Sequence, residues 1–193
     1  MRKIIFAVLF IFVLSVAAYA VPYGKTLGVG EKVFEIIYSA SLMQNSQTYG
    51  LPLRFGWGFA EGKELRLGTT FSDTAGTNST SYILGIKWEV YDMEKNGIDM
   101  ALAVPLSYAA QASAFSFSLL VDMSMPASWY TPYLVIGAGY TSSGAGSTTT
   151  FPVYFGANTT PWEFMDLYGH IGTTYEEGKS MPTVIEVGTE FKI

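Results

Sequence analysis

The sequence of 193 residues contains no cysteine and few charged residues, since Asp, Glu, Lys and Arg make up 14% of it. Without cysteine, no disulfide can hold an exported domain together, so stability must come from hydrogen bonding and packing. An average soluble domain has about 25% charged residues. Aromatic residues here reach 16%. A water-facing surface of this composition would be unusually apolar.

Other absences narrow the function classes further. A net charge of −5 and the lack of any basic run argue against a nucleic-acid partner. Beyond residue 20, no apolar run is long enough for a membrane helix, and the spacing of an amphipathic helix is hard to find. No phosphate-binding loop, thiol motif or cluster of metal ligands appears, so we expect no cofactor and no metal.

The start of the chain differs from the rest. Basic residues at 2–3 precede an apolar run over 4–16, and small residues lead up to Ala20. This is the pattern of a secretory signal peptide cleaved after Ala20. A membrane anchor is the alternative, but the run is short for a spanning helix. We therefore expect residues 1–20 to be a signal peptide and 21–193 to form one exported domain.

Alternation with a period of two recurs through the exported domain and predicts β-strands. In residues 51–60, for example, large apolar side chains alternate with Pro, Arg, Gly and Ala. Most segments of this kind approach the length of about ten residues that a tilted membrane strand needs. The segments are 34–42, 51–60, 65–71, 82–91, 98–109, 115–124, 132–140, 151–157, 165–171 and 184–193.

The connections between these segments alternate in kind. Those after the odd-numbered segments are longer and rich in Ser, Thr and Gly, as in "SDTAGTNSTS". Those after the even-numbered segments are tight turns by length and by their Gly, Asn, Asp and Pro content, as in "DMEKNG". We therefore predict an up-and-down antiparallel barrel with longer loops at one end and turns at the other.

The polar face of the segments indicates which side meets lipid. A soluble ligand-binding barrel also alternates, but its water-exposed outside is rich in Lys and Glu. Here the less apolar face is mainly Gly, Ala and Ser with scattered charges, which suits a narrow interior where charges neutralise each other across strands. The residues predicted to form this polar network in the lumen are Arg54, Arg66, Lys87, Glu89, Asp122, Asp166, His170, Glu186 and Glu190.

Aromatic residues gather near both ends of the predicted strands. A membrane barrel carries an aromatic girdle at each interface with water. The residues predicted to form the girdles are Trp57, Trp88, Trp129 and Trp162 at the turn end, and Tyr82, Tyr108 and Tyr140 at the loop end.

The last segment, "EVGTEFKI", carries the most specific pattern. A polar residue is followed two positions on by glycine, and hydrophobic or aromatic residues stand third from last and last. This resembles the C-terminal assembly signal of bacterial outer-membrane barrels, with Glu186, Gly188, Phe191 and Ile193 in the matching places. The departure is the last position, where Phe or Trp is commoner than Ile. The resemblance to small outer-membrane barrels covers residues 21–193 at the level of pattern. It implies an outer-membrane location and recognition by the barrel-assembly machinery.

His170 is the only histidine and the strongest candidate for catalysis. By strand phase it shares the lumen face with Asp166 and Tyr168, and a histidine near a carboxylate and a hydroxyl could act in acid–base chemistry. The resemblance to outer-membrane lipid-A deacylases fails, however, because Gly172 stands where their motif has a serine. The acidic cluster of outer-membrane proteases is also lacking. We therefore interpret His170 as part of the polar network and predict no catalytic residue.

The sequence thus predicts an all-β, monomeric transmembrane β-barrel of about ten strands, with eight as the alternative, in the bacterial outer membrane. Its leading functional hypothesis is a structural or surface role without enzymatic activity, with outer-membrane lipid and the assembly machinery as partners. The second is a narrow, porin-like channel for small solutes or ions, favoured by the small residues of segments 98–109 and 115–124. A lipid or peptide hydrolase using His170 and a soluble secreted barrel for an apolar ligand are the remaining hypotheses.

Overall fold

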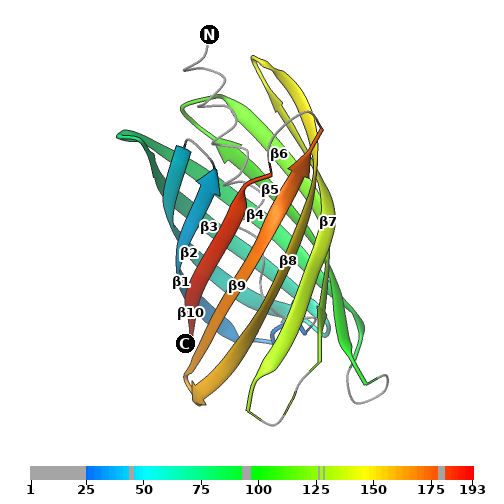
Figure 1. Ribbon diagram of the computed structural model, residues 1–193. Helices are drawn as coiled ribbons and strands as arrows, with labels where there is room; N and C mark the ends of the chain where they lie inside the picture. The colour runs from blue at the N-terminus through cyan, green and yellow to red at the C-terminus, as the bar shows by residue number, and fades with distance from the viewer. Residues whose placement is uncertain (1–24, 44–45, 93–96, 126, 128, 178–180) are drawn as a thin grey trace.

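The computed structural model describes residues 25–43, 46–92, 97–125, 127, 129–177 and 181–193. Within these ranges, ten antiparallel strands form a closed barrel in which each strand pairs with its neighbours in the chain and β1 pairs with β10 (Figure 1). This described part of the chain has no helix long and apolar enough to cross a membrane. The strands are β1 (Lys32–Met43), β2 (Ser46–Ala60), β3 (Lys63–Thr74), β4 (Thr77–Tyr91), β5 (Asp99–Ala109), β6 (Ala114–Ser124), β7 (Thr131–Ser143), β8 (Gly146–Trp162), β9 (Met165–Glu176) and β10 (Thr183–Lys192).

Each of the ten segments predicted from the alternation forms a strand, so the all-β, up-and-down antiparallel barrel is confirmed. The predicted signal peptide, residues 1–20, lies outside the described residues, as do 21–24. The division of the chain into 1–20 and 21–193 therefore stays a prediction.

The predicted difference between the two ends of the barrel is wrong. The polar segments expected as longer loops are largely strand: β3 continues to Thr74, and β4 already begins at Thr77. At the opposite end, the connection from Tyr91 to Asp99 is longer. Threonine is β-branched and favours extended backbone, so the Ser- and Thr-rich segments continue the strands instead of interrupting them.

Side chains alternate between the lumen and the outer surface. In β1, Val33, Glu35 and Ile37 are fully buried, whereas Phe34 and Ile36 are exposed. The other strands repeat this alternation, and the exposed face consists largely of aliphatic and aromatic side chains. The apolar face thus points outward and the polar face inward, which is the reverse of a soluble barrel with an apolar core. Because apolar area left in water is unfavourable by roughly 25 cal/mol per Å², this outer face is suited to lipid and not to water.

Tyrosine rings fill part of the lumen and lie over glycines of the next strand. A Cβ atom at Gly188 would lie 2.3 Å from Cζ of Tyr168, and one at Gly172 would lie 2.3 Å from Cδ1 of Tyr154. Close approach of a ring thus explains glycine at these inward positions. The three pairs, each directly opposite in register, are Tyr133 with Gly156, Tyr154 with Gly172 and Tyr168 with Gly188.

Three inward-facing prolines interrupt the hydrogen-bonded pairing of the wall. Between β1 and β2, the pairing stops at Leu53 and resumes at Gly50, so Pro52 lies in a gap. Pro105 lies in a similar gap between β5 and β6, and Pro152 in one between β7 and β8. Proline has no N–H to donate to a neighbouring strand. The barrel wall is therefore less fully bonded at these three places.

Candidate functional site

The lumen is charged in its lower and middle parts and rich in hydroxyl groups in its upper part. We call the end with the C-terminus the lower end, as in Figure 1. In the upper part, hydroxyl groups pair across strands, as in Ser116 with Thr141 and Ser72 with Ser79, both at 2.7 Å between oxygens. Apart from Glu176, the buried ionisable side chains lie below them: Glu35, Arg54, Glu64, Arg66, Lys87, Asp99, Asp122, Asp166, His170, Glu186 and Glu190.

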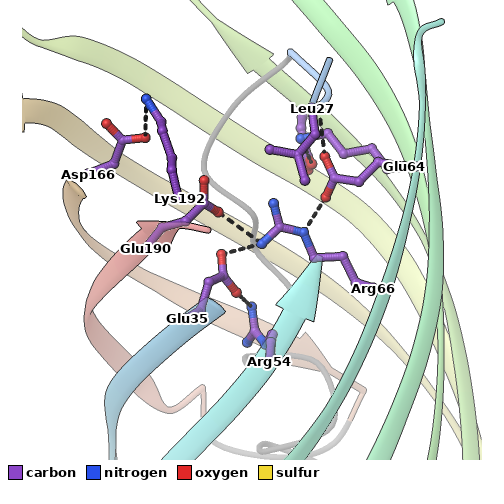
Figure 2. A network of polar contacts seen from close by, with 10 residues as sticks. Leu27, Glu35, Arg54, Glu64, Arg66, Asp166, Glu190 and Lys192 are labelled. Atoms are coloured by element: carbon purple, nitrogen blue, oxygen red, sulfur yellow. Dashed lines mark hydrogen bonds and ion pairs between the residues drawn. The ribbon is translucent and has the colours of Figure 1, made fainter. Parts of the chain in front are cut away.

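An ion-pair network centred on Arg66 lies in the lower lumen, along four neighbouring strands of the wall (Figure 2). Nη1 of Arg66 pairs with Oε1 of Glu35 and lies 3.0 Å from Oε2 of Glu190, and Nε donates to Oε1 of Glu64. Nη1 of Arg54 lies 3.5 Å from Oε2 of Glu35. We call these five residues the Arg66 network. It joins β1, β2, β3 and β10, and therefore spans the seam at which the barrel closes.

The strand register brings these groups together and leaves room for them. Glu35 lies directly opposite Arg54 on β2 and opposite Glu190 on β10. Two carboxylates facing each other would repel, and the guanidinium of Arg66 offsets this repulsion by pairing with both. Arg66 itself lies between Gly56 and Gly85 on the neighbouring strands, where no side chain competes for its space.

A second ion pair joins Lys87 and Asp122 across the intervening strand. Nζ of Lys87 lies 3.5 Å from Oδ2 of Asp122, and both side chains are buried. In register, Lys87 lies beside Ala103 of β5, and Asp122 lies beside Ala101 of the same strand. These small side chains let the lysine of β4 reach over β5 to the aspartate of β6.

His170 lies in a buried cluster between two tyrosines and a glutamate. Its Nδ1 is 3.1 Å from the hydroxyl of Tyr133, its Nε2 is 3.3 Å from Oε2 of Glu186, and its ring centre is 5.1 Å from that of Tyr154. Nε2 of His170 and Oε2 of Glu186 approach each other without meeting hydrogen-bond geometry. The side chains of His170 and Glu186 are 0% exposed. The cluster is packed on the lumen side of the barrel and offers no open face to a substrate.

The residues that sequence reasoning placed beside His170 make other contacts. Asp166 accepts a hydrogen bond from the hydroxyl of Thr160, and its Oδ2 lies 3.7 Å from Nζ of Lys192. Tyr168 shares the lumen face but lies over the glycine of β10. The alternation along β9 correctly predicted that His170 faces the lumen. It could not predict the partners of His170, because these come from other strands.

A cavity of about 440 Å³ lies at the lower mouth of the barrel. Arg66, Glu64 and Glu190 of the network line it from above, and residues 25–28 before β1 line another side. Among the described residues, no group of three or more His, Asp or Glu side chains is placed to hold a metal ion. The candidate functional site is therefore a polar lumen with charged pairs above a small chamber.

The predicted lumen residues all lie on the inner face, and eight of the nine are buried. The exception is Glu89, which is half-buried and accepts hydrogen bonds from the backbone and hydroxyl of Thr26. Within the Arg66 network, the prediction from the sequence missed Glu35 and Glu64. Glu35 is in phase with the inner face of segment 34–42, so it could have been found. Glu64 could not be assigned to a face, because it lies in a stretch that was interpreted as a turn.

The predicted aromatic girdle residues are exposed, and all but Trp129, which lies in the connection between β6 and β7, belong to strands. Trp57, Trp88, Trp129 and Trp162 are exposed at the lower end, and Tyr82, Tyr108 and Tyr140 are exposed nearer the upper end.

The residues of the predicted assembly signal lie in different places: two face the lumen from β10, one lies opposite β1, and one follows the end of β10. Glu186 and Gly188 face the lumen, where Glu186 contacts His170. Phe191 lies opposite Phe34 of β1. The backbone N–H of Ile193 donates to the carbonyl of Lys32 at 3.0 Å, which closes the barrel at its last residue. Their role in assembly stays a prediction.

No protein-family model matches the sequence, and no curated protein matches it. Solved structures match it by fold. An outer membrane channel from Pseudomonas putida F1 has a TM-score of 0.57 and 10% identity, over 91% of this chain and 99% of that one. The beta domain of the Bordetella autotransporter Brka has a TM-score of 0.57 and 11% identity, over 86% of this chain and 100% of that one.

The translocator domain of the autotransporter NalP from Neisseria meningitidis is similar as well. Its TM-score is 0.55 at 11% identity, over 86% of this chain and 90% of that one. Identities this low show a shared fold and not a shared activity. The fold of this chain is that of bacterial outer-membrane β-barrels.

Proposed function

We propose that this chain is an integral outer-membrane β-barrel with a structural or surface role and no enzymatic activity. The apolar outer face, with aromatic residues near both ends, supports the membrane location. The observation that carries the functional part is the Arg66 network, which joins four neighbouring strands inside the lumen through buried charges of opposite sign.

The network favours a closed interior over a conducting one. A barrel of eight strands has an interior about wide enough for side chains to fill, and ten strands widen it only modestly. Breaking a buried ion pair by removing one partner typically destabilises a protein by about 3–5 kcal/mol. The five side chains of the network and the inward-facing rings of Tyr133, Tyr154 and Tyr168 occupy space in this narrow interior. We therefore expect the paired charges to stabilise the barrel and to block bulk flow.

The surroundings of His170 support a non-enzymatic role. A general base must reach the proton that it abstracts, either directly or through one water molecule. His170 instead contacts Tyr133 and Glu186 on the lumen side of the barrel, with its side chain fully buried. This is the environment of a structural histidine.

Single-channel recording in planar bilayers tests the closed interior. The protein is refolded in detergent, folding is checked by a mobility difference between unboiled and boiled samples on SDS gels, and the folded fraction is added to the bilayer. The proposal predicts inserted protein that carries no discrete current. Reproducible current steps from folded protein would reject it.

A narrow channel for small solutes or ions is the second candidate. The hydroxyl groups of the upper lumen and the cavity of about 440 Å³ at the lower mouth lie on opposite sides of the Arg66 network, which would then be the constriction. The Pseudomonas putida protein with the same fold is described as a channel. In this case Arg66→Gln would shift the conductance towards cations, whereas a closed barrel stays silent in both forms.

A further inference from the structure

The segment before β1 crosses the lower mouth of the barrel. We call residues Lys25–Glu31 the strap; it is the dark blue segment at the lower end in Figure 1. The N–H of Gly30 donates to the carbonyl of Gly58 at 2.7 Å, and the N–H of Gly58 donates to the carbonyl of Glu31 at 3.0 Å. These bonds extend the pairing of β1 with β2 by one step beyond Lys32.

A tight turn then reverses the strap over the mouth. The N–H of Glu31 donates to the carbonyl of Gly28 at 3.0 Å, and Gly30 between them has a φ of 85°. A positive φ at the third position of such a turn is that of a type II turn, which requires glycine or asparagine there. The carboxylate of Glu31 also accepts a hydrogen bond from the N–H of Gly28 at 2.7 Å, and this second bond between the same two residues stabilises the turn.

Two inward-facing glutamates of the wall hold the far part of the strap. Oε2 of Glu89 accepts hydrogen bonds from the N–H of Thr26 at 3.1 Å and from its hydroxyl at 2.8 Å. Oε2 of Glu64 accepts one from the N–H of Leu27 at 3.0 Å, while its Oε1 accepts from Arg66 (Figure 2). The strap and the Arg66 network therefore share one carboxylate.

We propose that the strap is a displaceable partial closure of the lower mouth, held by Glu64 and Glu89, which narrows the opening of the cavity beneath the Arg66 network. This inference goes beyond the proposed structural role. The strap residues 25–28 line the cavity of about 440 Å³ together with residues of the wall. Most of the strap is exposed, and only Thr26 is buried. A segment with so little buried apolar surface opens at the low end of the free-energy range of a folded protein.

Gly58→Ala tests the strap without changing any charge. A Cβ atom at Gly58 would lie 2.1 Å from the carbonyl oxygen of Gly28 and 2.8 Å from that of Leu27, so it collides with the strap backbone. Gly144→Ala is the matched control, because a Cβ atom there has no atom within 4 Å. Glu89→Ala is a second releasing variant, since it removes both hydrogen bonds to Thr26.

Thiol labelling measures how far the strap restricts access to the cavity. The natural sequence has no cysteine, so Thr131→Cys places a single thiol on the cavity lining. Its modification rate by a charged methanethiosulfonate reagent is measured in folded protein, alone and combined with each variant above. We expect modification about tenfold faster with Gly58→Ala or Glu89→Ala, because each weakens the bonded, closed state of the strap. The rate with Gly144→Ala should equal that of Thr131→Cys alone.

Two results would overturn the strap as a closure. One is an equal modification rate in every folded variant; the other is slower modification with Gly58→Ala or Glu89→Ala than with Thr131→Cys alone. Folding of each variant is checked by the SDS gel shift, and Glu89→Ala carries the test if Gly58→Ala does not fold. Labelling does not depend on conductance, so its failure is distinguishable from failure of the closed-interior proposal.

Discussion

Glu35 and Glu190 lie directly opposite each other on the two strands that close the barrel, and the guanidinium of Arg66 pairs with both carboxylates. Closure of the first strand against the last thus places two like charges face to face inside the lumen. The opposite charge comes from β3. Arg54 of β2 also contacts Glu35, so the pairing of Glu190 is the part of the seam that depends on the third strand.

Removal of the Arg66 side-chain charge is expected to destabilise the barrel strongly. Arg66→Met leaves Glu35, Glu64 and Glu190 without their shared partner, and a buried pair broken on one side typically destabilises by about 3–5 kcal/mol. The midpoint of urea unfolding in detergent, followed by the loss of the SDS gel shift, measures this. As a control, Lys192→Met removes a pair whose lysine is 46% exposed, and it should change stability by at most about 0.5 kcal/mol. Equal effects of the two variants would contradict a stabilising role for the network.

Gly188→Val is expected to impair folding even without any assembly machinery. The new side chain would occupy the space of the Tyr168 ring, and overpacking of this kind typically destabilises by about 1–3 kcal/mol. The yield of refolding into detergent measures the effect. Adding Tyr168→Ala should restore part of the yield. If Gly188→Val refolds normally in detergent and fails only in cells, the glycine acts through recognition and not through packing.

Amide exchange should reveal the proline gaps in the wall. Amides beside Pro52 between β1 and β2 should exchange faster than those between β3 and β4, where pairing runs without interruption from Lys63 to Thr74. Hydrogen exchange followed by mass spectrometry or NMR in detergent measures this. Equal protection of the two regions would show that the missing proline N–H groups do not weaken the wall.

His170→Ala is expected to lower stability without changing any chemistry in the outer membrane. The substitution leaves the hydroxyl of Tyr133 and the carboxylate of Glu186 without their imidazole partner. We expect this to lower the free energy of unfolding by about 1–3 kcal/mol. Urea unfolding measures the stability, and profiles of membrane lipids and peptides from cells with either form measure the chemistry. A lipid or peptide product that disappears with His170→Ala would contradict the non-enzymatic proposal.

Alternation in the sequence was enough to predict the strands and their two faces, because side chains in a strand point to opposite sides with a period of two. Register between strands carries no such signal. The pairing of Arg66 with Glu35 and Glu190 depends on the relative register of β1, β3 and β10. The inward phase of Arg66 was therefore predictable, whereas its partners were not.

Connections were predicted least well, because polarity was interpreted as an interruption of the strand. The Ser- and Thr-rich stretch that includes Ser72 and Ser79 continues the alternation, and the hydroxyl groups of these two residues pair across β3 and β4. The strap was also missed, since Thr26 and Glu89 are 63 residues apart and no local pattern joins them.

Detergent-dependent folding tests whether the apolar face of the barrel meets lipid. Residues 21–193 are refolded in detergent and in plain buffer, then compared by circular dichroism and on SDS gels with and without boiling. We expect β-type dichroism and a mobility shift in detergent only. A chain that folds fully in plain buffer would contradict the membrane barrel and place the apolar face inside a soluble one.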